Sequence, residues 1–287
     1  MSAPAAPALP SLLGTHWDLT ASVIVPAAGA VVLYGLAARH RRWPARRTAS
    51  FVFGIAAIVI ALQSGIDSYD GQMLSDHMVQ HLLLLVVAPP LLLGGRPLLL
   101  ALRALPLNRR RAFARGLDQT RRFTRPVPAL ALFTAVMLLT HLPWFYDATL
   151  RHPALHDAEH GLYVLAGLLV WTPLLDGDPA PRHRLGGLGK LAYLIAAMMP
   201  MALIGAYLNR HATLVYPAYG PPARTLGISA LDDQAQAGAL MWVAGGVVMT
   251  AVGLWAAVAT MVAEERRQVA REARAASLYA SDGGPAP

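Results

Sequence analysis

Seven long apolar runs, separated by short polar segments, dominate the pattern of the chain. Each run is continuous and close to the roughly 20 residues that an α-helix needs to cross a bilayer, whereas the strands of a transmembrane barrel would alternate apolar and polar positions. The runs cover residues 18–38, 48–66, 73–94, 127–146, 155–175, 188–208 and 235–262. This pattern predicts an all-α, polytopic membrane protein built as a bundle of seven transmembrane helices.

The segments outside the runs divide the chain into three parts. Residues 1–17 are expected to form a short outer tail, because they lack the basic start of a signal peptide. Residues 18–262 are the predicted seven-helix transmembrane domain. Residues 263–287 are predicted to form a cytoplasmic tail that begins as a short helical extension.

Arginines and lysines concentrate on alternate loops. All of them except Arg151, Arg210 and Arg224 follow the first, third or fifth run or lie in the C-terminal tail. By the positive-inside rule this places the N-terminus outside and the C-terminus in the cytoplasm. The net charge of +8 is therefore a topology signal. It indicates contact with a lipid bilayer and no nucleic-acid partner.

Composition narrows the chemistry further. Only 14% of the 287 residues are charged and 55% are hydrophobic, whereas a soluble domain carries about a quarter charged residues. The chain has no cysteine, which excludes disulfides, thiolate metal sites and cysteine nucleophiles. Any soft-metal site must therefore use histidine, methionine and carboxylate ligands.

The histidines gather at one end of the predicted bundle. Apart from His40 and His183, all of them lie at outer ends of runs or in outer loops. The positive-inside rule does not account for this distribution, so a chemical role is expected.

The third run opens with two histidines and a methionine at four-residue spacing. Met73, His77 and His81 lie on one helix face. Two imidazoles four residues apart can hold one metal ion, and a thioether favours Cu(I). The alternative is that the two histidines only form hydrogen bonds to neighbouring helices.

The segment "RHPALHDAEHGLY" before the fifth run repeats this spacing with His152, His156 and His160. If the third and fifth runs are neighbours, four imidazoles can converge and His141 could join them; the sequence leaves this adjacency open. The acids Asp157 and Glu159 are expected to orient histidines or to cap the helix.

At the start of the seventh run, Asp233 and Met241 share a helix face, although N-capping by Asp232 or Asp233 is an equal alternative. No catalytic residue is predicted. The predicted metal ligands are His77, His81, His156, His160, Met73, His141, His152, Asp233 and Met241.

Three separated segments carry a resemblance to a known family. They are "HMVQHLLLLVVAPPLLLGGRPL", "HLPWFYDATLRHPALHDAEHGLYVLAGLLVWTPLL" and "DDQAQAGALMW", in this order. Together they resemble the CtaG family of cytochrome c oxidase assembly factors, seven-span proteins of the bacterial plasma membrane. One departure is Thr172, where a second aromatic residue is expected.

The resemblance implies a function without catalysis. The protein would deliver copper, as Cu(I), to the copper centre of the oxidase catalytic subunit, with a periplasmic copper donor as a further candidate partner. The family's histidine motif falls on His77 and His81, its outer-loop histidines on His156 and His160, and its acidic motif on Asp233 and Gln234.

Three rival functions remain open from the residues alone. Paired histidines on facing helices could bind haem or serve a quinol redox protein. A metal transporter would need ionisable groups through the inner half of the bundle. The pattern His-x-x-Glu-His at His156–His160 also fits an inverted zinc-protease motif.

Overall fold

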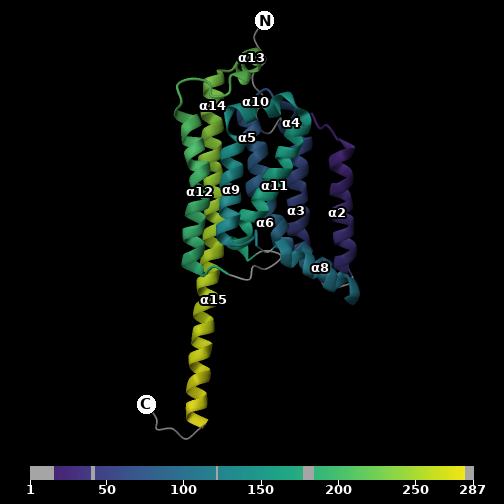
Figure 1. The fold of residues 1–287 in the computed structure, drawn as a ribbon, viewed down its shortest axis with the longest axis vertical. Helices are drawn as coiled ribbons and strands as arrows, with labels where there is room; N and C mark the ends of the chain where they lie inside the picture. The colour runs from purple at the N-terminus through teal and green to yellow at the C-terminus, as the bar shows by residue number, and fades with distance from the viewer. Residues whose placement is uncertain (1–15, 40–42, 121, 177–183, 282–287) are drawn as a thin grey trace.

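A computed structural model describes residues 16–39, 43–120, 122–176 and 184–281, and within these residues it is helical without a strand (Figure 1). The all-α prediction is confirmed. Most of the predicted outer tail, His40, His183 and the last six residues lie outside the described part of the chain. The orientation of the termini stays a prediction.

The helices follow one another with short connections. In chain order they are α2 (Ala21–Arg39), α3 (Ala45–Gln63), α4 (Gly65–Tyr69), α5 (Leu74–Leu82), η1 (Leu83–Val87), α6 (Ala88–Gly95), α7 (Pro97–Ala104), α8 (Leu107–Thr120), α9 (Pro126–Thr140), α10 (Pro143–Arg151), α11 (Pro153–Leu175), α12 (Gly187–Arg210), η2 (Pro217–Tyr219), α13 (Gly220–Thr225), α14 (Ala230–Ala239), η3 (Leu240–Ala244) and α15 (Gly245–Ser281).

Six helical stretches in the described residues are long and apolar enough to span a membrane, and a bent pair makes up to seven. The bent pair, α9 and α10, corrects the predicted span 127–146. Helix α9 ends at Thr140, and α10 leaves at 72°. The cause is Pro143, which offers no backbone N–H and keeps Leu142 extended (ψ 130°).

The last span also differs from its predicted bounds of 235–262. Its helix begins earlier, at Ala230, where the Ser229 hydroxyl accepts a hydrogen bond from the backbone N–H of Asp232. It then continues to Ser281 and projects beyond the bundle (Figure 1). Residues 263–281 contain neither glycine nor proline, so nothing in this segment stops the helix.

Helix α11 occupies the centre of the bundle and packs against η1, α6 and α9. The third and fifth predicted spans are therefore neighbours, which the sequence left open. Helices α4, α5, α10 and α13 gather at one end, which we call the histidine end because it carries His77, His81, His156 and His160 (Figure 1). Helix α8 lies at the opposite, arginine-rich end.

A π-helical segment accommodates Pro89 and Pro90 within the third span. These prolines lack the N–H groups that would bond the preceding turn, and η1 lies directly before them. The carbonyl of Leu85 accepts a hydrogen bond from the indole N–H of Trp171 at 3.2 Å. Helices α11 and α6 approach closely at Gly167, where a Cβ would lie 2.5 Å from Cγ of Pro89.

This close approach predicts a strong preference for glycine at position 167. Gly167→Ala should lower the free energy of unfolding by about 1–3 kcal/mol, because the added methyl also meets the Leu85 carbonyl oxygen at 2.6 Å. Thermal unfolding in detergent measures the effect. Gly161→Ala on the same helix is the matched control, since its Cβ would meet nothing within 4 Å. Equal stability of the two variants would contradict the packing described.

Candidate metal centre

Helix α5 presents two buried histidines at the histidine end of the bundle. His77 and His81 are one helical turn apart, and their ring centroids are separated by 4.2 Å. Only 0% and 4% of their surfaces are exposed. Both lie on the face that α5 turns towards α11.

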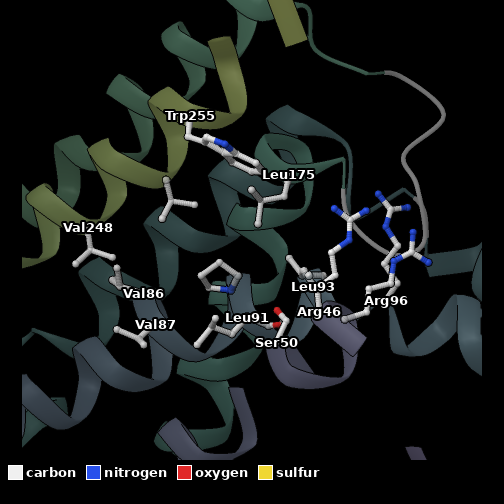
Figure 2. A pocket seen from close by; sticks show the side chains of 14 residues that line it. Arg46, Ser50, Val86, Val87, Leu91, Leu93, Arg96, Leu175, Val248 and Trp255 are labelled. Atoms are coloured by element: carbon white, nitrogen blue, oxygen red, sulfur yellow. The ribbon is translucent and has the colours of Figure 1, made fainter. Parts of the chain in front are cut away.

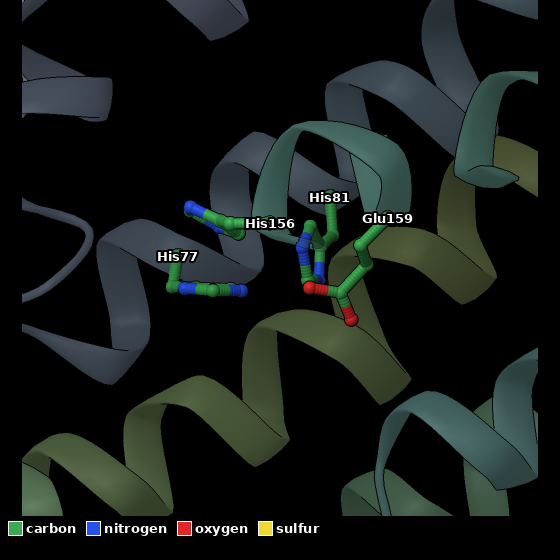
Figure 3. Close-up of side chains that lie close together, drawn as sticks. All are labelled: His77, His81, His156 and Glu159. Atoms are coloured by element: carbon green, nitrogen blue, oxygen red, sulfur yellow. The ribbon is translucent and has the colours of Figure 1, made fainter. Parts of the chain in front are cut away.

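Helix α11 brings the second pair. The rings of His156 and His160 are 4.2 Å apart. Across the helix interface, His77 lies 5.1 Å from His156, and His81 lies 6.0 Å from His160. The structure thus brings together the four imidazoles that the sequence placed on two separate helices. Figure 3 shows three of them, His77, His81 and His156.

Glu159 completes a compact set of donor atoms. One donor atom from each of His77, His81, His156 and Glu159 lies within 4.8 Å of the others (Figure 3). Both carboxylate oxygens of Glu159 are buried without a hydrogen-bond partner among the described residues. The nearby Thr149 hydroxyl donates instead to the carbonyl of Tyr146. A buried, unpaired carboxylate is costly unless a proton or a cation balances it.

Hydrogen bonds fix which nitrogen of His77 can bind an ion. The Tyr219 hydroxyl donates to the carbonyl of Asp70 at 2.9 Å, so its oxygen can accept from Nδ1–H of His77 at 3.2 Å. Nε2 of His77 is then the unprotonated nitrogen, which carries a lone pair. It is buried and has no hydrogen-bond partner in the described chain. A hydrogen bond on one imidazole nitrogen is the usual support for a ligand at the other.

His160 is held in the same way by a chain of polar groups. The Gln80 amide nitrogen donates to Asp67 at 2.7 Å and to the carbonyl of Ala61 at 3.1 Å. Its amide oxygen therefore accepts from Nε2–H of His160, at 3.1 Å. Nδ1 of His160 is therefore the unprotonated nitrogen, whose lone pair is available to bind an ion.

His81 stands out because it has no such support. Both ring nitrogens are buried and neither meets a hydrogen-bond partner among the described residues. Its ring stacks on Tyr163, with centroids 4.1 Å apart. An unpartnered buried donor or acceptor costs about 1–3 kcal/mol, which a bound ion would remove.

A second set of donor atoms, with Asp70 as its carboxylate, lies beside the first. Asp70, His156 and His160 also have donor atoms within 4.8 Å of one another, and Asp70 lies 3.6 Å from Nε2 of His156. Burial raises the pKa of Asp70 to about 7, helped by the negative charge of Asp67. A groove of about 680 Å³ between α2, α3 and α11 reaches His160 and is lined by Asp67 and Asp157.

The other predicted ligands fall into three groups. Met241 and His141 line a small buried space that His81 also borders, together with the thioethers of Met78, Met137 and Met201. His141 donates from Nδ1 to the carbonyl of Met137 at 2.8 Å, and its Nε2 has no partner in the described residues.

Met73 and His152 lie at helix starts. Met73 is buried as the residue before α5. His152 is exposed at the N-terminus of α11, so the structure does not bring it into the cluster.

Asp233 lies at the N-terminus of α5. Its carboxylate accepts hydrogen bonds from the backbone N–H groups of Leu74 at 2.7 Å and Ser75 at 3.2 Å, and from the Ser75 hydroxyl. Asp233 therefore anchors the helix that carries His77 and His81. Ligation by Asp233 stays an untested prediction.

Tyr219 and Gln80 support the histidines but were not predicted, and Glu159 was predicted to orient histidines or cap the helix, not to supply a donor atom to the cluster. For Glu159 a signal existed, because it lies three residues after His156 and thus on the same helix face. Tyr219 and Gln80 gave no local signal, since their histidine partners are 142 and 80 residues away.

The fold and the site together define a polytopic helical membrane protein with a buried histidine–carboxylate cluster at one end. The profile of the cytochrome c oxidase caa3 assembly factor family (Caa3_CtaG) matches residues 30–263. The chain therefore belongs to this family and is a multi-pass bacterial membrane protein.

Similar chains occur in mycobacteria. Uncharacterized protein Mb0105 of Mycobacterium bovis and Uncharacterized protein MT0111 of Mycobacterium tuberculosis are each 30% identical over 279 residues, covering 90% of this chain. Uncharacterized protein ML1998 of Mycobacterium leprae is 28% identical over 251 residues, covering 84% of this chain. The chain spans 42%, 42% and 38% of these relatives. No solved structure gives a significant match.

Proposed function

We propose that the protein binds Cu(I) in the histidine–carboxylate cluster and delivers it to the copper centre of the cytochrome c oxidase catalytic subunit. The observation that carries the proposal is the convergence of His77, His81, His156 and Glu159 within 4.8 Å, buried and with unpartnered donor atoms. Membership of a family of cytochrome c oxidase assembly factors supports a role in oxidase assembly, and copper as the cargo is our inference.

The donor set favours Cu(I) over harder ions. Neutral imidazoles and thioethers suit a soft monovalent cation, whereas Mg²⁺ and Ca²⁺ prefer oxygen ligands. The methionine-lined space beside His81 and His141 adds soft donors next to the cluster. Glu159 would balance the charge of the ion in a medium of low polarity.

The groove beside His160 supports delivery as well as storage. Its acidic lining, Asp67 and Asp157, would attract a cation, and the groove opens between α2 and α11. Helix α2 stands at the edge of the bundle and packs mainly on α3 and α7 (Figure 1). Copper could therefore enter or leave without passing through the bundle.

The arrangement of the histidines argues against the haem and transporter alternatives. A porphyrin between His81 and His160 would have to displace His77 and His156, which touch one helical turn away. Transport would need a polar path to the other end. Among the described Asp, Glu, His, Lys and Arg residues, Lys190 is the one that is buried away from the histidine end, and it is paired with Asp176 at 2.9 Å.

Metal loading of the purified protein tests the proposal. Wild type should retain near-stoichiometric Cu(I) against a competing chelator, and both His77→Ala/His81→Ala and His156→Ala/His160→Ala should lose it, because each pair supplies half of one site. Zn(II) loading in parallel tests the zinc-protease alternative.

The matched control is His152→Ala/His211→Ala, which removes two exposed histidines from the same end of the bundle. If the control lost copper to the same degree as the cluster variants, binding would be a surface effect and the proposed site would be wrong.

The thioethers give a separate prediction. Met201→Leu/Met241→Leu keeps the volume of the buried space but removes two sulfur atoms, so Cu(I) affinity should fall by about tenfold while Zn(II) affinity stays unchanged. Chelator competition measures both affinities. Met199→Leu, on an exposed face of α12, is the control. An unchanged Cu(I) affinity would show that the methionines only fill space.

A further inference from the structure

A second cavity, unrelated to the histidine cluster, opens at the arginine-rich end of the bundle. It measures about 620 Å³ and lies between α3, η1, α6 and α15. Figure 2 shows its two faces: aliphatic side chains and Trp255 on one side, and guanidinium groups including those of Arg46 and Arg96 on the other. No histidine or carboxylate lines it, so it cannot serve the metal chemistry described above.

The arginine rim is held in place by packed aromatic groups. The guanidinium of Arg47 lies 4.7 Å above the ring of Trp43. The Trp43 indole N–H donates to the Tyr34 hydroxyl, which donates to the carbonyl of Gly95, both at 2.7 Å. Arg47 and Arg96 are therefore half-buried against packed groups, whereas Arg46 is exposed, as are Arg109, Arg111 and Arg115 of α8.

The backbone at this point is also specialised. Arg96 adopts a left-handed conformation (φ 51°) between α6 and α7, which is uncommon for residues other than glycine. Gly95 lies so close to α3 that a Cβ would be 2.7 Å from Cβ of Phe51. These two features bring Arg96 next to Arg47.

The clustered charges lack a counterion within the described chain. The charged groups that act on Arg47 include Arg46, Arg96 and Arg103, all of the same sign. No ion pair between these arginines and a described carboxylate is formed. The positive-inside rule explains arginines in a loop, but it does not require them to converge at the mouth of an apolar cavity.

We propose that this cavity binds an anionic phospholipid, with its phosphate on Arg46, Arg47 and Arg96 and one acyl chain along the apolar wall formed by Val248 and Leu175. A basic pocket between transmembrane helices is the arrangement that recognises acidic lipid headgroups. The apolar wall distinguishes this ligand from a free inorganic anion, which would gain nothing from it.

Native mass spectrometry of the detergent-purified protein, titrated with phosphatidylglycerol or phosphatidylcholine, tests the proposal. Wild type should bind phosphatidylglycerol at least about tenfold more tightly than phosphatidylcholine. The variant Arg46→Gln/Arg47→Gln/Arg96→Gln should bind phosphatidylglycerol at least about tenfold more weakly than wild type. Arg109→Gln/Arg111→Gln/Arg115→Gln removes the same charge from exposed positions of α8 and should stay within about twofold of wild type.

Two further arms separate the lipid from other ligands. Val248→Phe fills the cavity but keeps every arginine, and it should also weaken phosphatidylglycerol binding. Inorganic phosphate should not compete with the lipid. Equal binding of both lipids, equal losses in the two triple variants, or full competition by phosphate would each overturn the proposal. Circular dichroism of each variant establishes that it is folded.

Discussion

Cells that carry His77→Ala/His81→Ala should assemble a cytochrome c oxidase depleted of copper. The two imidazoles form the α5 half of the cluster and meet His156 and Glu159 across the helix interface. Loss of supporting groups around a metal lowers affinity by about 10–100-fold, so loss of two of the proposed ligands should lower it by more than about a hundredfold. The expected readout is low copper and low activity in oxidase purified from cells grown under copper limitation.

The control has to separate loss of copper from loss of the assembly factor. Immunoblots of the membrane fraction should show wild-type amounts of the variant, because the substitutions remove buried nitrogens that have few partners in the described structure. His152→Ala/His211→Ala should leave oxidase copper unchanged. Normal oxidase copper with the His77/His81 variant would contradict a copper role for the cluster.

Asp233→Ala should destabilise the protein strongly. The carboxylate accepts two backbone N–H groups at the start of α5 together with the Ser75 hydroxyl. Leaving these buried donors without an acceptor should cost about 3 kcal/mol or more. Thermal unfolding in detergent measures the loss, and Asp232→Ala, at the exposed neighbouring position, should be within about 0.5 kcal/mol of wild type.

The conservative variant Asp233→Asn distinguishes an anchoring residue from a ligand. Its amide oxygen can still accept from one backbone N–H, so stability should fall less than in Asp233→Ala, and Cu(I) loading should follow the amount of folded protein. A fully stable Asp233→Asn variant that cannot bind copper would instead identify Asp233 as a direct ligand.

The sequence predicted those features that depend on local spacing. His77 with His81, and His156 with His160, lie on one helix face because they are four residues apart, and long apolar runs locate the spans. The adjacency of α5 and α11 could not be predicted, since helix order depends on packing between distant segments. Gly167 is one determinant of that packing, because it allows α11 to approach Pro89.

The supporting roles of Asp233 and Tyr219 could not be predicted either, because their partners are distant in the sequence. Asp233 was interpreted as a ligand or as a cap of its own helix, yet it binds the start of a helix 159 residues away. Tyr219 lies in the short segment η2, which has no periodicity to mark it. The bend at Pro143 has a local cause, but residues 141–146 are mostly apolar, so they were assigned to the same straight span as residues 127–140.

The π-helical segment η1 separates two halves of one span that face different neighbours. Helix α5 directs its histidines towards α11, whereas α6 directs Gly94 and Gly95 towards α3. A π turn holds one residue more than an α turn, so the two halves differ in rotational phase. Losing one residue between Leu83 and Val87 would rotate the histidine pair by about 100° relative to the glycines. The length of this five-residue segment should therefore be under stronger constraint than its side chains.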